Sequence, residues 1–188
     1  MKKLVAFAAA LVVAAGPLFA MTVDGVKIPD TVTVGDKTLK LNGAGVRKRA
    51  IVRVYIAGLY LENNSKDAAA IIASGETKSM RLRMMRAVEG PKISGAIGEG
   101  FQLNSASSMS ELKDRLAKFA KMIPDVKEGD EIAMTWVPSQ GTVISVRGTT
   151  TGTIEGRDFA DALFSVWLGA NPVQDDLKAA LTAGASGG

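Results

Sequence analysis

The chain has 188 residues, a formal net charge of +4, and neither cysteine nor histidine. Without cysteine there is no disulfide, thiolate nucleophile or thiolate-bound cluster, and without histidine there is no Ser–His–Asp triad and no histidine-ligated metal. Any acid–base chemistry must therefore use Asp, Glu, Lys, Tyr or a bound water. The usual short motifs for nucleotides and metals are also absent, so we expect no cofactor and no metal.

The first twenty residues have the layout of a secretory signal peptide. Lys2 and Lys3 give a basic start, an unbroken apolar run follows over 4–15, and a Gly-Pro pair breaks it before Ala20. We expect cleavage near Ala20 and export to a bacterial periplasm; the alternative is an uncleaved N-terminal anchor. No later segment approaches the roughly 20 apolar residues that a membrane helix needs. Without this leader the charge is +2, too near balance to predict a nucleic-acid partner.

The remaining sequence predicts one domain over residues 21–182, followed by a flexible tail over 183–188. Hydrophobic periodicity and turn residues predict strands at 23–26, 31–34, 37–41, 50–61, 78–88, 131–137, 142–147 and 148–154. Helices are predicted at 65–73, 91–101, 108–123, 157–168 and 173–181. This order predicts an α+β fold in which helices cover one face of an antiparallel sheet.

The predicted strand over 50–61 carries an arginine and a tyrosine two positions apart. If side chains alternate regularly, Arg53 and Tyr55 share one face, and both faces of the strand are mostly apolar. An arginine beside a tyrosine hydroxyl is a suitable receptor for a carboxylate at the end of an apolar ligand. The alternative is that Arg53 extends to the sheet edge while Tyr55 packs in the core.

Two segments resemble the chalcone isomerase family. GAGVR at 43–47, followed by RVYIAGLYLE at 53–62, is similar to the opening of that fold, where a G-x-G-x-R turn precedes a strand ending in G-[VL]-Y-L-E. FSVWLGANPV at 164–173 resembles the family's late helix, which ends in a glycine and a turn before another helix. The resemblance covers essentially the whole mature chain and is nearest to the bacterial exported members. It implies an open-faced sandwich, an antiparallel sheet covered by a layer of helices.

The resemblance also implies positions for a binding site. In the plant enzymes an Arg from the turn, a strand Thr, a Tyr and an Asn on a covering helix, and a late Ser or Thr surround the flavonoid. Arg47 matches the Arg and Tyr55 stands in place of the Thr. The other three positions fall at Ile93, Gly100 and Val166. Because these side chains cannot hydrogen-bond a substrate, the resemblance argues against the family's cyclisation chemistry.

Arg47 with Tyr55 instead resembles the fatty-acid-binding branch of the fold, where an Arg and a Tyr hold a carboxylate in an apolar cleft. We therefore expect a non-catalytic periplasmic carrier or sensor of a small amphipathic ligand, with Arg53 as the alternative partner of Tyr55. One alternative function is an isomerase or lyase acting on an unknown small substrate. Another is a ligand-free interaction module, in which the basic cluster around Lys48 and Arg49 meets an acidic protein partner or anionic lipid.

Overall fold

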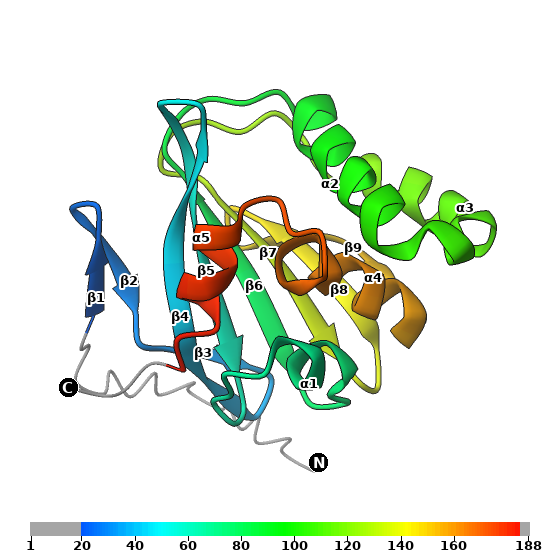
Figure 1. Cartoon of the computed structure of the whole chain (residues 1–188), viewed down its shortest axis with the longest axis horizontal. Coiled ribbons are helices and arrows are strands. Elements are labelled where there is room, and N and C mark those ends of the chain that lie inside the picture. The colour runs from blue at the N-terminus through cyan, green and yellow to red at the C-terminus, as the bar shows by residue number, and fades with distance from the viewer. Residues whose placement is uncertain (1–19, 185–188) are drawn as a thin grey trace, which may run out of the picture.

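The computed structural model describes residues 20–184. Residues 1–19 of the leader predicted over 1–20, and the last four residues of the predicted tail, lie outside the described residues. Export to the periplasm and cleavage near Ala20 therefore stay predictions. The described part forms a curled antiparallel sheet with helices on one face (Figure 1). This arrangement confirms the α+β class that the order of strands and helices predicts.

The main sheet of the described residues has seven strands in the order β3-β4-β5-β6-β7-β8-β9, so each strand pairs with its neighbour in sequence. Its strands are β3 (Thr31–Val34), β4 (Lys37–Arg49), β5 (Val52–Leu61), β6 (Lys78–Met84), β7 (Glu131–Val137), β8 (Gly141–Val146) and β9 (Thr149–Ile154). A separate hairpin consists of β1 (Ala20–Val23) and β2 (Val26–Pro29). Every one of these pairings is antiparallel.

The helices are α1 (Ala68–Ala73), α2 (Gly90–Ser105), α3 (Met109–Ala120), α4 (Arg157–Leu168) and α5 (Asp175–Leu181), with a 3-10 turn η1 (Ala106–Ser108). Pro91 lies in the first turn of α2, as the sequence predicts. The Asp67 carboxylate, which accepts a hydrogen bond from the backbone of Ala70 at 3.0 Å, caps α1 in place of the predicted Ser65. The capping box predicted at Ser108 does not form, because its side chain makes no capping hydrogen bond.

The core lies between the sheet and the helices. Buried strand residues such as Leu59 and Met80 pack there with an aromatic group from three helices, in which Phe159 lies 5.3 Å from Phe101 and 6.2 Å from Phe119, centroid to centroid. A second, smaller cluster lies on the opposite face of β5, under the β1–β2 hairpin. It includes Ile28, Ile56 and Tyr60. Strand β5 is therefore covered on both faces, as its apolar pattern predicts.

Strand β4 is longer than the sequence predicts. Residues 43–47, expected as a turn, continue the strand and pair with β5 up to Arg49. The two glycines of this stretch allow α5 to lie directly on the strand: a Cβ on Gly45 would come within 2.8 Å of the Ala180 Cβ. The glycines thus permit a close helix–strand approach instead of a turn.

Candidate functional site

Arg47 and Tyr55 lie directly opposite each other on neighbouring strands. They are register partners in the β4–β5 pair, next to the pair formed by Val46 and Ile56. Both side chains are half-buried, and both lie on the side of the sheet that the helices cover. Directly opposed residues have side chains about 5 Å apart at their bases, so they can act on one ligand group. The structure therefore brings together the two residues that the sequence pairs.

The hydroxyl of Tyr55 has a fixed partner from a distant part of the chain. Its oxygen accepts a hydrogen bond of 3.0 Å from Nε1 of Trp167, a residue of α4 that is 1% exposed. Burial raises the pKa of the Tyr55 hydroxyl, while the Trp167 hydrogen bond and the positive charge of Arg47 act in the lowering direction. The phenol thus stays protonated at neutral pH. Because the Trp167 indole can only donate, this bond uses the Tyr55 oxygen as an acceptor and leaves the Tyr55 O–H available as a donor.

The guanidinium of Arg47 is held by a neutral side chain. Its Nη1 donates to Oε1 of Gln174 at 3.3 Å and to the carbonyl of Lys48. The same Gln174 oxygen accepts from the backbone N–H of Lys48 at 2.9 Å, and Gln174 Nε2 donates to the carbonyl of Val46 at 3.2 Å. Among residues 20–184, no carboxylate lies within ion-pair distance of Arg47. Its charge is therefore oriented but not neutralised.

Arg53 does not share a face with Tyr55, contrary to the regular alternation that the sequence predicts. The β4–β5 register shifts between Arg47 and Lys48, so β5 has one more residue than β4 at this point. Such a β-bulge interrupts alternation. The Arg53 guanidinium lies instead 3.0 Å from the carboxylate of Asp24, in the turn of the β1–β2 hairpin. Because Arg53 is paired with Asp24 and Arg47 lies opposite Tyr55, the geometry favours Arg47 over Arg53 as the partner of Tyr55.

The three remaining candidate positions are apolar and buried. Ile93, on α2, belongs to the main core, as does Val166 on α4. Gly100 lies where α2 crosses α4, and a Cβ at this position would come within 2.8 Å of Val166 Cγ1. These residues supply no hydrogen-bonding side chain, as the sequence predicts. Their contact with a ligand stays a prediction.

Comparisons with known proteins identify the family and the fold of this chain. The sequence profile of the chalcone isomerase-like family matches residues 20–182. The chain belongs to this family. No curated protein matches the sequence significantly. The structure is similar to the crystal structure of a fatty-acid binding protein of Arabidopsis thaliana, with a TM-score of 0.67 and 15% identity over 85% of this chain and 93% of that one. At this identity the similarity shows the fold alone.

Two residues of this chalcone isomerase-like chain complete the candidate site, and sequence reasoning missed both. Trp167 lies 112 positions from Tyr55, and Gln174 lies 127 positions from Arg47. A buried indole N–H needs an acceptor, which is a general signal that Trp167 would find a polar partner. For Gln174, which precedes the first residue of α5, the sequence carries no comparable signal.

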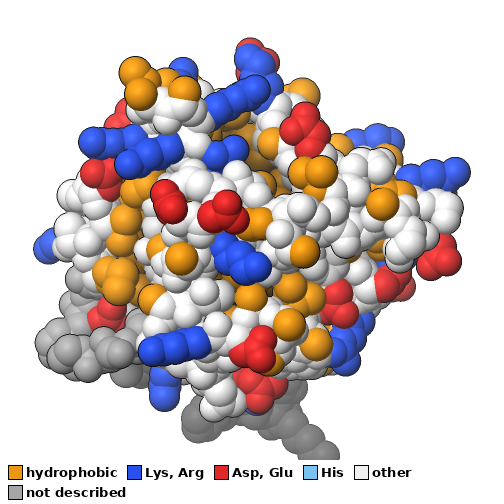
Figure 2. All heavy atoms as spheres, in the orientation of Figure 1, with side chains coloured by type: hydrophobic (Ala, Val, Ile, Leu, Met, Phe, Trp, Pro, Cys, Tyr) orange, Lys and Arg blue, Asp and Glu red, His pale blue; other side chains and the backbone are white. Residues whose placement is uncertain are grey.

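The surface near the end of the β4–β5 hairpin is hollowed. Figure 2 shows a recess between the end of the β4–β5 hairpin and the start of α2, with hydrophobic side chains inside it and both basic and acidic side chains around it. These are the elements that carry Arg47, Tyr55 and Ile93. Two separate cavities lie elsewhere: one of about 170 Å³ at Tyr60 and Arg81, and one of about 210 Å³ at Ile71 and Lys78.

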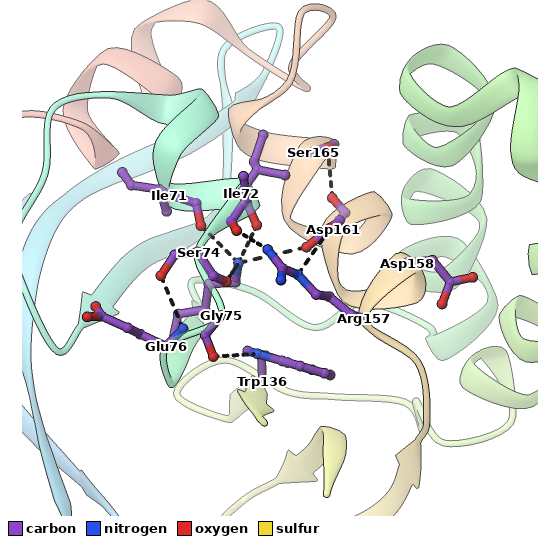
Figure 3. A network of polar contacts seen from close by, with 12 residues as sticks. Ile71, Ile72, Ser74, Gly75, Glu76, Trp136, Arg157, Asp158, Asp161 and Ser165 are labelled. Carbon is purple, nitrogen blue, oxygen red and sulfur yellow. Dashed lines mark hydrogen bonds and ion pairs between the residues drawn. The ribbon is translucent and has the colours of Figure 1, made fainter. Parts of the chain in front are cut away.

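A buried lysine lies beside the second of these cavities. Lys78, 1% exposed, donates hydrogen bonds of 2.5–3.0 Å to three carbonyls at the end of α1, those of Ile71, Ile72 and Ser74. Figure 3 shows this network, in which Arg157 and Asp161 reach the same place from α4. Lys78 therefore satisfies the free carbonyls of α1 and ties that helix to the sheet.

Burial lowers the pKa of Lys78 to about 8, with Asp161 acting in the raising direction and Arg157 in the lowering direction. Because its ammonium group is occupied by the carbonyls of Ile71, Ile72 and Ser74, we assign Lys78 a structural role. Within the described chain, no group of three or more acidic side chains is arranged to hold a metal ion. No helix between residues 20 and 184 is long and apolar enough to cross a membrane.

Proposed function

We propose that the protein is a non-catalytic periplasmic binding protein for a small amphipathic ligand whose carboxylate, like that of a fatty acid, is held by Arg47 and Tyr55. The observation that carries this proposal is the cross-strand pairing of these two residues, with both side chains oriented by residues from α4 and the segment before α5. A cation without an anionic partner and a hydroxyl with a free proton form a matched receptor for a carboxylate.

Three further facts support binding over catalysis. The recess between the β4–β5 hairpin and α2 offers apolar surface for a hydrocarbon chain (Figure 2). The positions where the plant enzymes carry hydrogen-bonding groups are here the apolar residues Ile93, Gly100 and Val166. A relative of the same fold is named as a fatty-acid binding protein. Electrostatic groups that would polarise a reacting substrate are thus few, whereas those needed to anchor a head group are present.

The test compares palmitate with hexadecanol, which has the same chain length but no charge. We expect palmitate to raise the melting temperature and to bind saturably, and hexadecanol to bind much more weakly. Replacing Arg47→Gln removes the charge and should lower palmitate affinity by roughly 10- to 100-fold, the range for a hydrogen bond to a charged group. The matched control is Arg53→Gln, which removes an arginine from the same hairpin and should leave affinity within about twofold.

Mass spectrometry of small molecules extracted from the protein purified from cells gives an independent readout. We expect a carboxylate-bearing amphiphile in the wild-type extract and its depletion in Arg47→Gln. The proposal fails if neither probe binds, if hexadecanol binds as tightly as palmitate, or if Arg53→Gln loses as much affinity as Arg47→Gln.

A further inference from the structure

The tip of the β4–β5 hairpin exposes apolar side chains. Ile51 is 94% exposed and Val52 is 40% exposed, and among residues 20–184 the only other large hydrophobic residues exposed in this way are Met21 and Leu103. Figure 2 shows hydrophobic side chains at the extreme end of this hairpin, which projects from the body of the molecule in Figure 1. An isolated exposed isoleucine is ordinary, but this one lies at the end of a projection.

The turn itself is built from unusual residues for its geometry. Arg49 pairs with Val52, so Ala50 and Ile51 form a two-residue loop, and Ala50 adopts a φ of 53°. Two-residue hairpin loops favour glycine, asparagine or aspartate, because these residues adopt positive φ at low cost. Here the loop residues are instead Ala50 and Ile51, and the positive φ of Ala50 is energetically unfavourable for a residue with a Cβ. Strain retained at an exposed position points to a use for the side chains it displays.

Basic side chains surround this apolar tip. Lys48 and Arg49 are exposed, and in the described chain no carboxylate lies within ion-pair distance of either. Arg53 is exposed too, although Asp24 neutralises it. Arg86 follows the adjacent end of β6, where the backbone of Met85 bonds to that of β5, and it is also exposed. The unpaired charge on the hairpin tip itself, from Lys48 and Arg49, is therefore positive.

We propose that the β4–β5 hairpin tip docks the protein on an anionic phospholipid surface, with Ile51 inserted at the headgroup level and Lys48 and Arg49 contacting lipid phosphates. Basic residues near an anionic membrane strengthen binding by about fivefold each, and a buried aliphatic side chain adds to this. A stable protein interface buries about 1,200–2,000 Å² in total, which suits a broad face, whereas this tip is a narrow projection. The lipid surface therefore fits the tip better than an acidic protein does.

The experiment measures co-sedimentation with vesicles of phosphatidylglycerol and phosphatidylcholine, against phosphatidylcholine alone. The protein is purified as the cell produces it, and all variants share its N-terminus, so any contribution of that segment cancels. We expect binding to the anionic vesicles only, weakened by salt. Ile51→Ser should lower the partition coefficient by about tenfold, and the double variant Lys48→Glu/Arg49→Glu should abolish binding.

Matched controls exist on α2 and α3. Leu103→Ser changes another exposed apolar residue, and Lys113→Glu/Lys118→Glu makes the same change in net charge; both should bind within about twofold of wild type. Melting temperatures check that each variant is folded. Equal losses of vesicle binding in the control and tip variants would overturn the proposal. Failure of the wild type to bind anionic vesicles would also overturn it. Tip-dependent cross-linking to an acidic protein without vesicle binding would also overturn it, in favour of a protein partner.

Discussion

The indole Nε1 of Trp167 donates a 3.0 Å hydrogen bond to the hydroxyl oxygen of Tyr55. This bond joins α4 to β5 within the main core and fixes which way the phenol points. It also decides what the phenol can do. With its acceptor site occupied by a donor-only side chain, the hydroxyl can offer its own proton to a carboxylate held by Arg47.

The first prediction concerns this hydroxyl. Tyr55→Phe keeps the ring but removes the donor to the ligand and leaves the buried Trp167 N–H without its acceptor, so we expect palmitate affinity to fall by about tenfold and stability to fall by about 1–3 kcal/mol. Tyr60 supplies a control on the same strand, because it lies in the smaller core on the opposite face and its hydroxyl donates to the carbonyl of Pro29 at 2.8 Å. Tyr60→Phe should lose stability without losing affinity. Titration calorimetry and urea unfolding measure the two effects, and equal affinity losses would contradict this role of Tyr55.

A second prediction concerns the side chain that orients Arg47. Gln174 accepts from Arg47 and Lys48 and donates to the carbonyl of Val46. Gln174→Ala removes these bonds but leaves the guanidinium in place, so affinity should fall several-fold, less than in Arg47→Gln. Gln174→Glu places a carboxylate beside Arg47, and this internal anion should compete with the ligand. We therefore expect the order of palmitate affinity to be wild type, Gln174→Ala, Gln174→Glu. An affinity in Gln174→Glu equal to that of wild type would show that Arg47 does not hold the head group.

The sequence predicts the fold better than it predicts the site. Periodicity and turn residues give the antiparallel sheet and the helical layer, because hydrophobic burial acts on regular patterns. The pair of Arg47 and Tyr55 came from resemblance, since residues eight positions apart meet only through the register of two strands. Regular alternation placed Arg53 beside Tyr55, and a single bulge, which the sequence does not mark, moved it to the other face.

The partners of the pair illustrate the same limit. Trp167 and Gln174 reach Tyr55 and Arg47 only because α4 and α5 pack on the sheet. Their contacts depend on where each helix lies along the strands, which is a tertiary property. The length of β4 also depends on tertiary packing. Its glycines favour a turn locally, but the close packing of α5 on Gly45 stabilises a strand instead.

A third prediction follows from the buried Lys78, whose pKa is about 8 in the folded protein and 10.5 in the reference state. Between these values the unfolded chain binds more protons than the folded one, so the unfolding free energy rises with pH across this window. Below pH 8 both states are protonated and the cost of burying the charge is fully present. The gain from deprotonation amounts to about 3 kcal/mol by pH 10.5.

The measurement is urea unfolding at pH 7.5 and pH 10, for the wild type and for Lys78→Met. The variant cannot bond the carbonyls of Ile71, Ile72 and Ser74, so we expect it to be less stable at both pH values. Comparing the two proteins cancels the titration of exposed lysines. The stability advantage of the wild type should grow as pH rises, and an advantage that shrinks would mean that the Lys78 pKa is not lowered.

The last prediction uses two glycines of α2 as a matched pair. A Cβ on Gly100 would lie 2.8 and 2.9 Å from the two methyl carbons of Val166 and 3.2 Å from its Cβ, so rotating the valine side chain cannot clear it. Gly100→Ala should therefore cost about 1–3 kcal/mol of stability through overpacking. Gly95 lies on the exposed side of the same helix with nothing within 4 Å of a new Cβ, and Gly95→Ala should stabilise the protein by about 0.5–1 kcal/mol.

A double variant tests the contact between α2 and α4 directly. Because the Gly100→Ala methyl group would meet Val166, adding Val166→Ala makes room for it. The loss of unfolding free energy in the double variant should then be smaller than the sum of the two single losses, by about 1 kcal/mol or more. A double-mutant cycle by urea unfolding measures this difference. Strict additivity would show that α2 and α4 do not meet at these residues.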